Sequence, residues 1–190
     1  MSLHSILSKF KDELFGTYDL DRRAEREYQK MRVLLKKGGK LNMFMAKRIQ
    51  NKLQLKYLLK IPLSAVIGEN FQIRHPEGIL IGRTCIIGDN CKVYPYFTAI
   101  AALKGDNYRY SNNIRRHPKI GDDCVLGSKA TVIGPITIGD DVTIGACAIV
   151  TKDIPSHSVV KGTNMVRRKR VEEIPEKYIE EYLKEIACEN

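Results

Sequence analysis

IGDDCV LGSKAT VIGPIT IGDDVT IGACAI, residues 120–149, is a series of six-residue units, and this stretch decides the fold. Each unit begins with Ile, Leu or Val, and in most units Gly comes next. The same spacing extends over residues 67–156. The recurring apolar residues are Ile67, Ile73, Ile81, Ile87, Val93, Ile120, Leu126, Val132, Ile138, Ile144 and Val150.

A six-residue period matches neither an amphipathic helix nor an alternating strand. It is typical of a chain that forms a short strand, turns at a corner and repeats, so that three units complete one triangular coil. Such coils stack at the strand spacing of roughly 4.8 Å, with the apolar residue inside and Gly relieving crowding at the corner. The sequence therefore predicts a left-handed parallel β-helix rather than a β-sandwich, whose turns recur every ~8–12 residues.

The composition is that of a single globular domain with helical additions, because the chain has 190 residues and 43% of them are hydrophobic. No run of ~18 apolar residues is present, and the first residues lack a signal-peptide core, so we expect a cytoplasmic protein. The five Cys show no paired spacing such as CxxC. We therefore expect buried, reduced thiols and no metal.

Positive charge is concentrated near the start of the chain. The net charge is +10, and residues 1–60 hold fifteen Lys or Arg against six Asp or Glu. A second basic cluster covers residues 167–170. Such clusters bind nucleic acid, an anionic membrane or cofactor phosphates, or form a solvated helix face. Because no aromatic platform or nucleic-acid motif accompanies the charge, we expect no nucleic-acid partner.

These shifts in composition predict three segments: a basic helical segment over 1–60, the β-helix over 61–162 with an inserted loop at 99–119, and an extension with a short helix over 163–190. In the first segment an apolar stripe is interrupted at Gly38-Gly39 and needs a packing partner. Its members are Leu34, Leu35, Leu41, Phe44, Met45, Ile49, Leu53 and Leu58. Pro175 is expected to open the last helix, with Ile179, Tyr182, Leu183 and Ile186 on one face.

The six-residue period fails in two places, and each contains a histidine. The unit after Ile73 has eight residues and includes His75, and the long interruption before Ile120 ends in His117. Insertions into a strict repeat lie on the surface and often carry function. His4 and His157 lie in segments without other polar groups of note. His75 and His117 are therefore the candidate functional residues.

Three motifs carry a resemblance to a known family: RHPEGILIG (74–82), RHPKIG (116–121) and IGACAIVTKDIPSHSVVKG (144–162). They resemble the hexapeptide-repeat acyltransferases, and the two His placements resemble the serine acetyltransferase branch, over roughly residues 62–166. The resemblance implies a homotrimer that binds acetyl-CoA in the groove between neighbouring subunits. It also implies that a histidine removes the proton of the acceptor.

By this resemblance His75 and His117 take the catalytic and acceptor-orienting positions, and Arg116 takes the place of an arginine that holds an acceptor carboxylate. The chemistry suits such a pair, because an imidazole with a pKa near 6.5 can accept the proton of an attacking hydroxyl at neutral pH. Which of the two is the base stays open. The resemblance places the cofactor at Ser128, Ala146, Thr151, Lys152, Arg167 and Lys169.

Departures from serine acetyltransferase bear on the acceptor. Arg74 stands where that family has an aspartate for the ammonium of serine, and a guanidinium would repel the ammonium. Lys60 stands where the aspartate that supports the histidine would fall. The inserted loop offers groups that suit a sugar, namely Tyr108, Arg109, Tyr110, Asn112 and Asn113. We therefore predict an O-acetyltransferase that acts on a saccharide in polysaccharide or capsule synthesis, with serine acetyltransferase as the alternative.

Two other classes share the predicted fold. A γ-class carbonic anhydrase needs three His ligands for zinc, whereas only two histidines are suitably placed in this sequence. A non-catalytic scaffold would need neither histidine. For the basic segment over 1–60 we hypothesise contact with the anionic inner face of the cell membrane, where a lipid-linked acceptor would be found.

Overall fold

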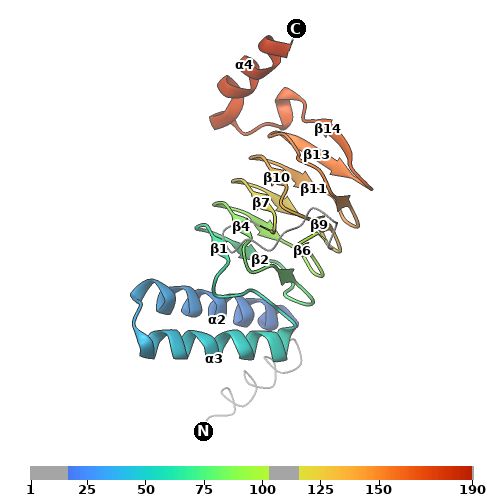
Figure 1. Ribbon diagram of the computed structural model, residues 1–190. Coiled ribbons are helices and arrows are strands. Elements are labelled where there is room, and N and C mark those ends of the chain that lie inside the picture. Colours follow the sequence, from blue (N-terminus) through green and yellow to red (C-terminus); the bar gives the residue numbers. More distant parts are fainter. Residues whose placement is uncertain (1–16, 103–115, 190) are drawn as a thin grey trace, which may run out of the picture.

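The computed structural model describes residues 17–102 and 116–189, and their β-strands form three sheets (Figure 1). The first sheet contains β1 (Val66–Ile67), β4 (Ile86–Ile87), β7 (Lys119–Ile120) and β10 (Thr137–Ile138). The second contains β2 (Gln72–Ile73), β5 (Lys92–Val93), β8 (Val125–Leu126), β11 (Thr143–Ile144), β13 (Ser158–Lys161) and β14 (Met165–Arg168). The third contains β3 (Leu80–Ile81), β6 (Thr98–Ile100), β9 (Thr131–Ile133) and β12 (Ile149–Val150).

From β1 to β12 the chain visits the three sheets in turn, so each of these coils contributes one strand to each sheet. Neighbouring coils pair in parallel register, and Ile87 aligns with Ile67 on one side and with Ile120 on the other. The apolar residue of each unit therefore stacks on that of the next coil. The left-handed β-helix predicted from the six-residue period is confirmed.

The core of the prism consists of the residues that define the period. Ile73, Ile81, Leu126 and Ile144 are 0–1% exposed. The small residues four places later in their units are also buried, among them Cys85, Cys91, Cys124, Ala130 and Ala148. Burial of side chains on this scale is the main stabilising contribution in a fold whose strands are only two to four residues long.

Glycine at the corners is required by the spacing between coils. A Cβ atom on Gly88 would lie 2.7 Å from the carbonyl carbon of Gly121, and a Cβ on Gly121 would lie 2.8 Å from that of Gly139. Both distances are shorter than van der Waals contact allows. A side chain at either position would therefore push the coils apart.

The N-terminal helices form a hairpin at one end of the prism (Figure 1). Helix α2 (Thr17–Lys37) and helix α3 (Lys40–Tyr57) are joined by Gly38 and Gly39, whose φ angles are 64° and 84°. Side chains with a Cβ rarely adopt these angles, so the two glycines permit the reversal. Tyr28 of α2 packs its ring 5.9 Å from that of Phe71, which anchors the hairpin on the first coil.

The apolar stripe predicted in this segment is only partly buried. Leu53 is 1% exposed, and Leu34, Leu35 and Ile49 pack against the core. By contrast, Leu41 and Phe44, which lie on the side of α3 opposite its buried residues, are 72% and 60% exposed, and Leu58, just after the helix, is 63% exposed. The predicted packing partner is thus present in this chain for one part of the stripe, whereas the other part is exposed.

The C-terminal segment closes the other end of the prism. Strand β14 pairs antiparallel with β13, and the chain continues through short 3₁₀ turns at Val171–Glu173 and Glu176–Tyr178 into α4 (Ile179–Glu189). Pro175 precedes a 3₁₀ turn rather than α4 itself. Tyr182 is 3% exposed but Leu183 is 49% exposed, so these two predicted partners do not share a buried face. None of the helices in the described residues combines the length and apolar character that crossing a membrane requires.

Candidate active site

The two candidate histidines lie at different corners of the prism. His75 follows β2 and precedes β3, so it lies at the corner between the second and third sheets, here named the first corner. His117 lies between β6 and β7, at the corner between the third and first sheets, here named the second corner. The third sheet separates the two corners. A single chain therefore does not bring the two imidazoles together.

His75 is held by a carboxylate from the N-terminal hairpin. Its Nδ1 lies 2.6 Å from Oδ2 of Asp21 in α2, and the imidazole is 61% exposed. A carboxylate only accepts hydrogen bonds, so the Nδ1–H of His75 donates to Asp21, and in the neutral imidazole Nε2 is left as an acceptor. The backbone of His75 has a φ of 55°, in the left-handed region. The same angle recurs at this corner in the following coils, at Tyr96, Lys129 and Cys147, so it belongs to the geometry of the corner and not to the histidine alone.

Asp21 was missed by the sequence analysis. The two residues lie far apart in the chain, and Asp21 belongs to a helical segment that contains no motif. The resemblance placed a supporting carboxylate at the position of Lys60, whose backbone forms the first β-bridge with Leu80. Only the packing of α2 against the first coil brings Asp21 to His75.

His117 has the opposite hydrogen-bonding arrangement. The Oγ1 of Thr84 lies 2.7 Å from its Nδ1, and the backbone N–H of Thr84 donates to the same nitrogen at 3.4 Å. Because an N–H can only donate, Nδ1 of His117 is an acceptor and Nε2 carries the proton. The ring lies over Gly82, where an added Cβ would be 1.8 Å from Cδ2 of the imidazole.

Arg116 supports the neutral form of His117. Its backbone N–H donates to Thr84 Oγ1 at 3.3 Å, and its positive charge acts on the ring. Partial burial, together with this positive charge, lowers the pKa of His117 below its usual value. The imidazole is therefore uncharged at neutral pH and presents Nε2–H as a donor.

Arg74 is exposed at the first corner, directly before His75 in the chain. Its guanidinium donates to Gln72 Oε1 at 2.7 Å. The structure thus brings Arg74 and His75 to one corner and places Arg116 and His117 at the other. The predicted sugar-binding residues Tyr108 and Tyr110 lie outside the described residues.

Four predicted cofactor residues divide between the same two corners. Ser128 and Ala146 follow β8 and β11 at the first corner, in the column of coils that begins at His75. The hydroxyl of Ser128 donates to the carbonyl of Pro95 at 3.0 Å, whereas Ala146 is exposed. Thr151 and Lys152 follow β12 at the second corner, and both are exposed.

The other two predicted cofactor residues already have carboxylate partners. Arg167 forms two hydrogen bonds to Glu173, at 2.8 and 3.1 Å, and this contact lowers the pKa of Glu173 to about 2. Lys169 Nζ lies 2.6 Å from Asp141 Oδ1, and the lysine side chain is 11% exposed. Lys169 therefore presents little of its charge to the surface in this structure.

His157 was set aside in the sequence analysis as lacking polar neighbours, and that prediction is wrong. Its side chain is 1% exposed, and Nδ1 lies 3.2 Å from Asp141 Oδ2, the carboxylate that also binds Lys169. The rings of Tyr178 and Tyr182 pack against the imidazole at 5.1 and 5.3 Å. Periodicity gave no sign of this cluster, because its members come from the last coils and the C-terminal extension. Its burial indicates a structural role in holding that extension on the prism.

No group of three or more His, Cys, Asp or Glu in the described ranges is arranged to hold a metal ion. His75 has one carboxylate neighbour and His117 has a threonine. Neither set resembles the three-histidine site that a γ-class carbonic anhydrase requires. Instead, the first corner offers the Nε2 of His75 as an acceptor, and the second corner offers the Nε2–H of His117 as a donor.

Comparisons with known proteins agree with this fold and these motifs. The family model "Bacterial transferase hexapeptide (six repeats)" matches residues 117–152. The serine acetyltransferase of Bacillus pumilus is 40% identical over 104 residues, which are 55% of this chain and 45% of that protein. Serine acetyltransferase 2 of Arabidopsis thaliana is 34% identical over 139 residues, which are 73% of this chain and 40% of that protein.

Among solved structures, the serine acetyltransferase of Neisseria gonorrhoeae in complex with serine matches with a TM-score of 0.58 and 27% identity. The match covers 76% of this chain and 54% of that one. The chain thus spans about half the length of the relatives that it matches. Over residues 117–152 the chain therefore matches the repeat of the hexapeptide transferases, and its β-helix is similar to that of the serine acetyltransferase structure. These three relatives, from two bacteria and a plant, are all serine acetyltransferases.

Proposed function

We propose that this protein is an acetyl-CoA-dependent O-acetyltransferase. The observation that carries the proposal is the complementary state of the two imidazoles: Asp21 leaves Nε2 of His75 free to accept a proton, and Thr84 leaves Nε2–H of His117 free to donate one. Acyl transfer to a hydroxyl needs one group of each kind. The matched family model and the serine acetyltransferase relatives support the same reaction class.

In the proposed reaction His75 Nε2 takes the proton of the acceptor hydroxyl as the hydroxyl oxygen attacks the thioester carbonyl carbon. His117 Nε2–H donates to the acceptor or to the developing oxyanion. The tetrahedral intermediate then collapses, the carbon–sulfur bond breaks, and the CoA sulfur leaves with the proton held by His75. No acyl-enzyme forms, so the site needs no nucleophilic side chain, and the positioning of two substrates supplies much of the acceleration.

We infer that the working protein is a cyclic homotrimer. The first and second corners of one subunit lie at opposite edges of the third sheet. A site that contains both histidines must therefore combine the first corner of one subunit with the second corner of a neighbouring subunit. A threefold arrangement places the first corner of one subunit beside the second corner of the next. Ser128 and Ala146 would then line one wall of the cleft, and Thr151 and Lys152 the other, where acetyl-CoA is proposed to bind.

Asp21 is proposed as a positioning residue for His75. We expect Asp21→Asn to lower kcat by about 10–10²-fold, because the amide no longer fixes the Nδ1–H tautomer and the ring orientation. The KM for acetyl-CoA should change little, since Asp21 does not contact the proposed donor site. Asp21→Glu, which restores a carboxylate, should recover part of the loss in kcat. If Asp21→Asn and Asp21→Glu lower kcat by the same factor, and both also lower the thermal stability, Asp21 has a merely structural role.

For the acceptor, the relatives favour L-serine, which the sequence analysis ranked second. One observation favours a different hydroxyl compound: Arg74 is exposed at the first corner, where the resemblance expects an aspartate for the ammonium of serine. A guanidinium keeps its charge at all relevant pH values. A saccharide hydroxyl is therefore kept as the second candidate acceptor.

An assay of CoA release decides between the two acceptors. Purified protein is given acetyl-CoA with L-serine, and separately with a panel of sugars and sugar nucleotides. Rapid release with serine establishes serine O-acetyltransferase activity, and release only with a saccharide establishes the second candidate. If Arg74 excludes serine, Arg74→Asp should raise the rate with serine and lower the rate with the saccharide. No release with any acceptor, together with no binding of acetyl-CoA, would refute the proposed reaction class.

A further inference from the structure

We propose that the outward face of helix α3 is a docking surface for an anionic lipid bilayer. This surface, named the α3 face, consists of Leu41, Phe44, Arg48, Lys52, Leu55 and Lys56, with Leu58 just beyond the end of the helix. Lys52 also pairs with Glu27 of α2 at 3.2 Å. The exposed fractions of its apolar side chains are 72% for Leu41, 60% for Phe44, 84% for Leu55 and 63% for Leu58. The proposal does not depend on the acetyl-transfer reaction.

The position of these residues on the helix makes the surface continuous. Leu41, Phe44, Arg48 and Leu55 are spaced three, four and seven residues apart, which places them on one side of α3. The buried residues Ala46, Gln50, Leu53 and Tyr57 occupy the opposite side. An exposed apolar stripe along a helix is typical of a contact surface rather than of isolated exposed residues.

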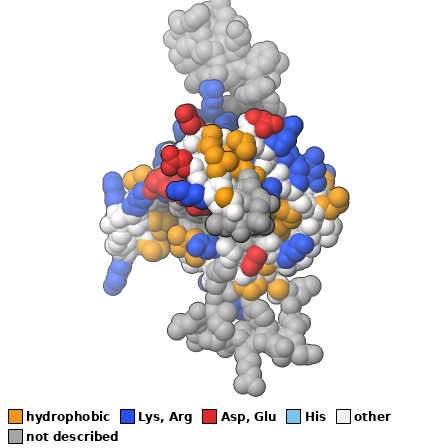
Figure 2. All heavy atoms as spheres, turned by 90° about the horizontal axis from the view of Figure 1, so that it is seen from above, with side chains coloured by type: hydrophobic (Ala, Val, Ile, Leu, Met, Phe, Trp, Pro, Cys, Tyr) orange, Lys and Arg blue, Asp and Glu red, His pale blue; other side chains and the backbone are white. Residues whose placement is uncertain are grey.

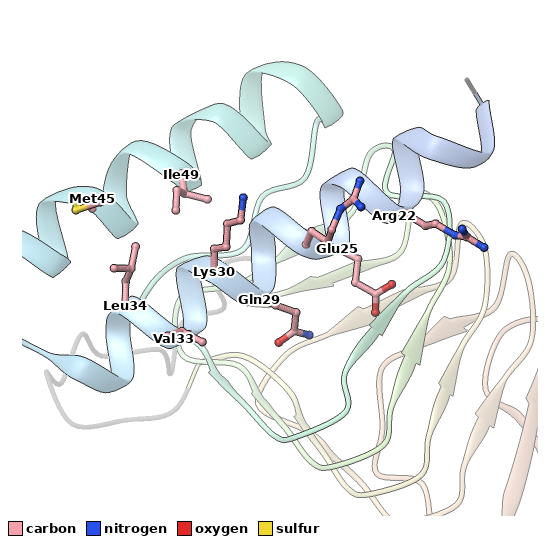
Figure 3. A pocket seen from close by; sticks show the side chains of 9 residues that line it. Arg22, Glu25, Gln29, Lys30, Val33, Leu34, Met45 and Ile49 are labelled. Carbon is pink, nitrogen blue, oxygen red and sulfur yellow. The ribbon is translucent and has the colours of Figure 1, made fainter. Parts of the chain in front are cut away.

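An apolar groove continues the surface onto α2. Val33, Leu34, Met45 and Ile49 line a groove of about 790 Å³ between the two helices (Figure 3). Met45 and Ile49 come from α3, and Val33 and Leu34 from α2. Arg22, Arg26 and Lys30 border it, together with one acidic residue, Glu25. The groove thus adds apolar area next to the α3 face and has cationic residues at its edge.

Charge indicates which partner this surface fits. Helix α3 contains five Lys or Arg and no Asp or Glu. Between Glu27 and Glu69 the sequence has ten Lys or Arg and no acidic residue at all. The other end of the prism differs, because Figure 2 shows acidic and basic side chains side by side on the face seen from the C-terminal end. A partner of the α3 face must therefore be anionic.

The apolar side chains then distinguish a bilayer from other anionic partners. A nucleic acid would neutralise the cations but would leave Leu41, Leu55 and Leu58 without an apolar environment. A second copy packed on the same face would place the cations of one α3 against those of the other, which is unfavourable. An anionic bilayer offers phosphates to the cations and acyl chains to the leucines.

Arg48 shows how the two kinds of group are combined. Its guanidinium carbon lies 6.0 Å from the centre of the Phe44 ring, so a cation stands directly over an exposed aromatic side chain. Lys and Arg can extend their charged ends toward headgroups while apolar neighbours enter the acyl boundary. The α3 face therefore suits shallow interfacial contact, parallel to the bilayer plane.

The test uses the full-length protein and a fluorescent reporter. The chain contains no Trp, so Phe44→Trp introduces a single tryptophan on the α3 face, and Met165→Trp, at 68% exposure on β14, is the matched control. With vesicles of phosphatidylcholine and phosphatidylserine, emission from residue 44 should shift to the blue, and emission from residue 165 should not. The shift should be absent with phosphatidylcholine alone and should be lost in about 0.5 M salt.

Co-sedimentation with the same anionic vesicles gives a second measurement. Arg48→Glu combined with Lys56→Glu should lower vesicle binding roughly tenfold or more, because two cations are replaced by two anions at the contact. Lys92→Glu combined with Lys129→Glu makes the same change in net charge on exposed positions of the prism and should lower binding far less. Equal losses in the two pairs, or no binding by the wild type, would overturn the proposal.

The oligomeric state separates the bilayer from a second copy of the chain. Phe44→Ser combined with Leu55→Ser removes exposed apolar groups and should leave the mass in solution unchanged while reducing vesicle binding. A fall in mass, measured by sedimentation in the absence of lipid, would show that the α3 face is an interface between copies and would refute the proposal. Because neither acetyl-CoA nor acceptor is present, these outcomes are independent of the proposed enzymatic function.

Discussion

Substitution of His75 by alanine is expected to lower kcat by about 10²–10⁴-fold, the usual effect of losing a general base. In the proposed mechanism the residue accepts at Nε2 because Asp21 holds its Nδ1–H. The fold should persist, since the imidazole is 61% exposed. Steady-state rates of CoA release, with circular dichroism as the folding control, measure the effect.

A comparison of glutamine variants tests the assignment of base and donor. Glutamine cannot accept a proton at neutral pH, but its amide N–H can donate a hydrogen bond. His75→Gln should therefore be as inactive as His75→Ala, whereas His117→Gln should retain more activity than His117→Ala. The reverse pattern would make His117 the base. Near wild-type turnover in His75→Ala would remove His75 from the mechanism.

The fold was predictable because the same pattern, an inward apolar residue followed by a corner, recurs in many six-residue units. Every inward residue from Ile73 to Val150 in the six-residue series is buried, and Gly88 and Gly121 occur where a Cβ would strike the next coil. A period of six residues with these properties has few structural solutions. The two failures of the period also located His75 and His117 correctly at the surface corners of the coils, because an extra residue cannot remain inside a strict coil.

What the sequence did not predict depends on contacts between segments far apart in the chain. Asp21 contacts His75 only because α2 packs on the first coil, and no local sequence pattern predicts that contact. The buried Asp141, His157 and Lys169 come together from two coils and the extension after β13, so each residue in isolation resembles an ordinary surface residue. The resemblance suggested Lys169 as a cofactor ligand, and the structure shows that Lys169 also has Asp141 as a partner.

The helical hairpin illustrates a third limit. Its apolar stripe was detected from spacing, but spacing does not distinguish residues that face the protein from residues that face outward. Leu53 and Leu55 are two positions apart, yet one is 1% exposed and the other 84% exposed. The direction of each side chain follows from how α3 sits against α2, which is a property of the tertiary structure.

The geometry of the two corners leads to a complementation experiment with a large expected effect. If each site combines His75 of one subunit with His117 of its neighbour, chains that carry His75→Ala and chains that carry His117→Ala are each inactive alone. When equal amounts assemble randomly into mixed trimers, roughly a quarter of the sites receive an intact first corner and an intact second corner. Activity should therefore return to about a quarter of the wild-type value, well above either variant.

The control uses two substitutions at the same corner. Asp21 and His75 meet within one subunit, so mixed trimers of Asp21→Asn and His75→Ala chains contain no intact first corner and should show no gain over Asp21→Asn alone. Mixing Asp21→Asn with His117→Ala should restore activity, because these substitutions affect different walls of the cleft. Native mass spectrometry verifies that mixed trimers have formed. If mixed trimers of His75→Ala and His117→Ala are present and remain inactive, the two histidines do not share a site across the interface, and the mechanism that assigns one as base and the other as donor must be abandoned.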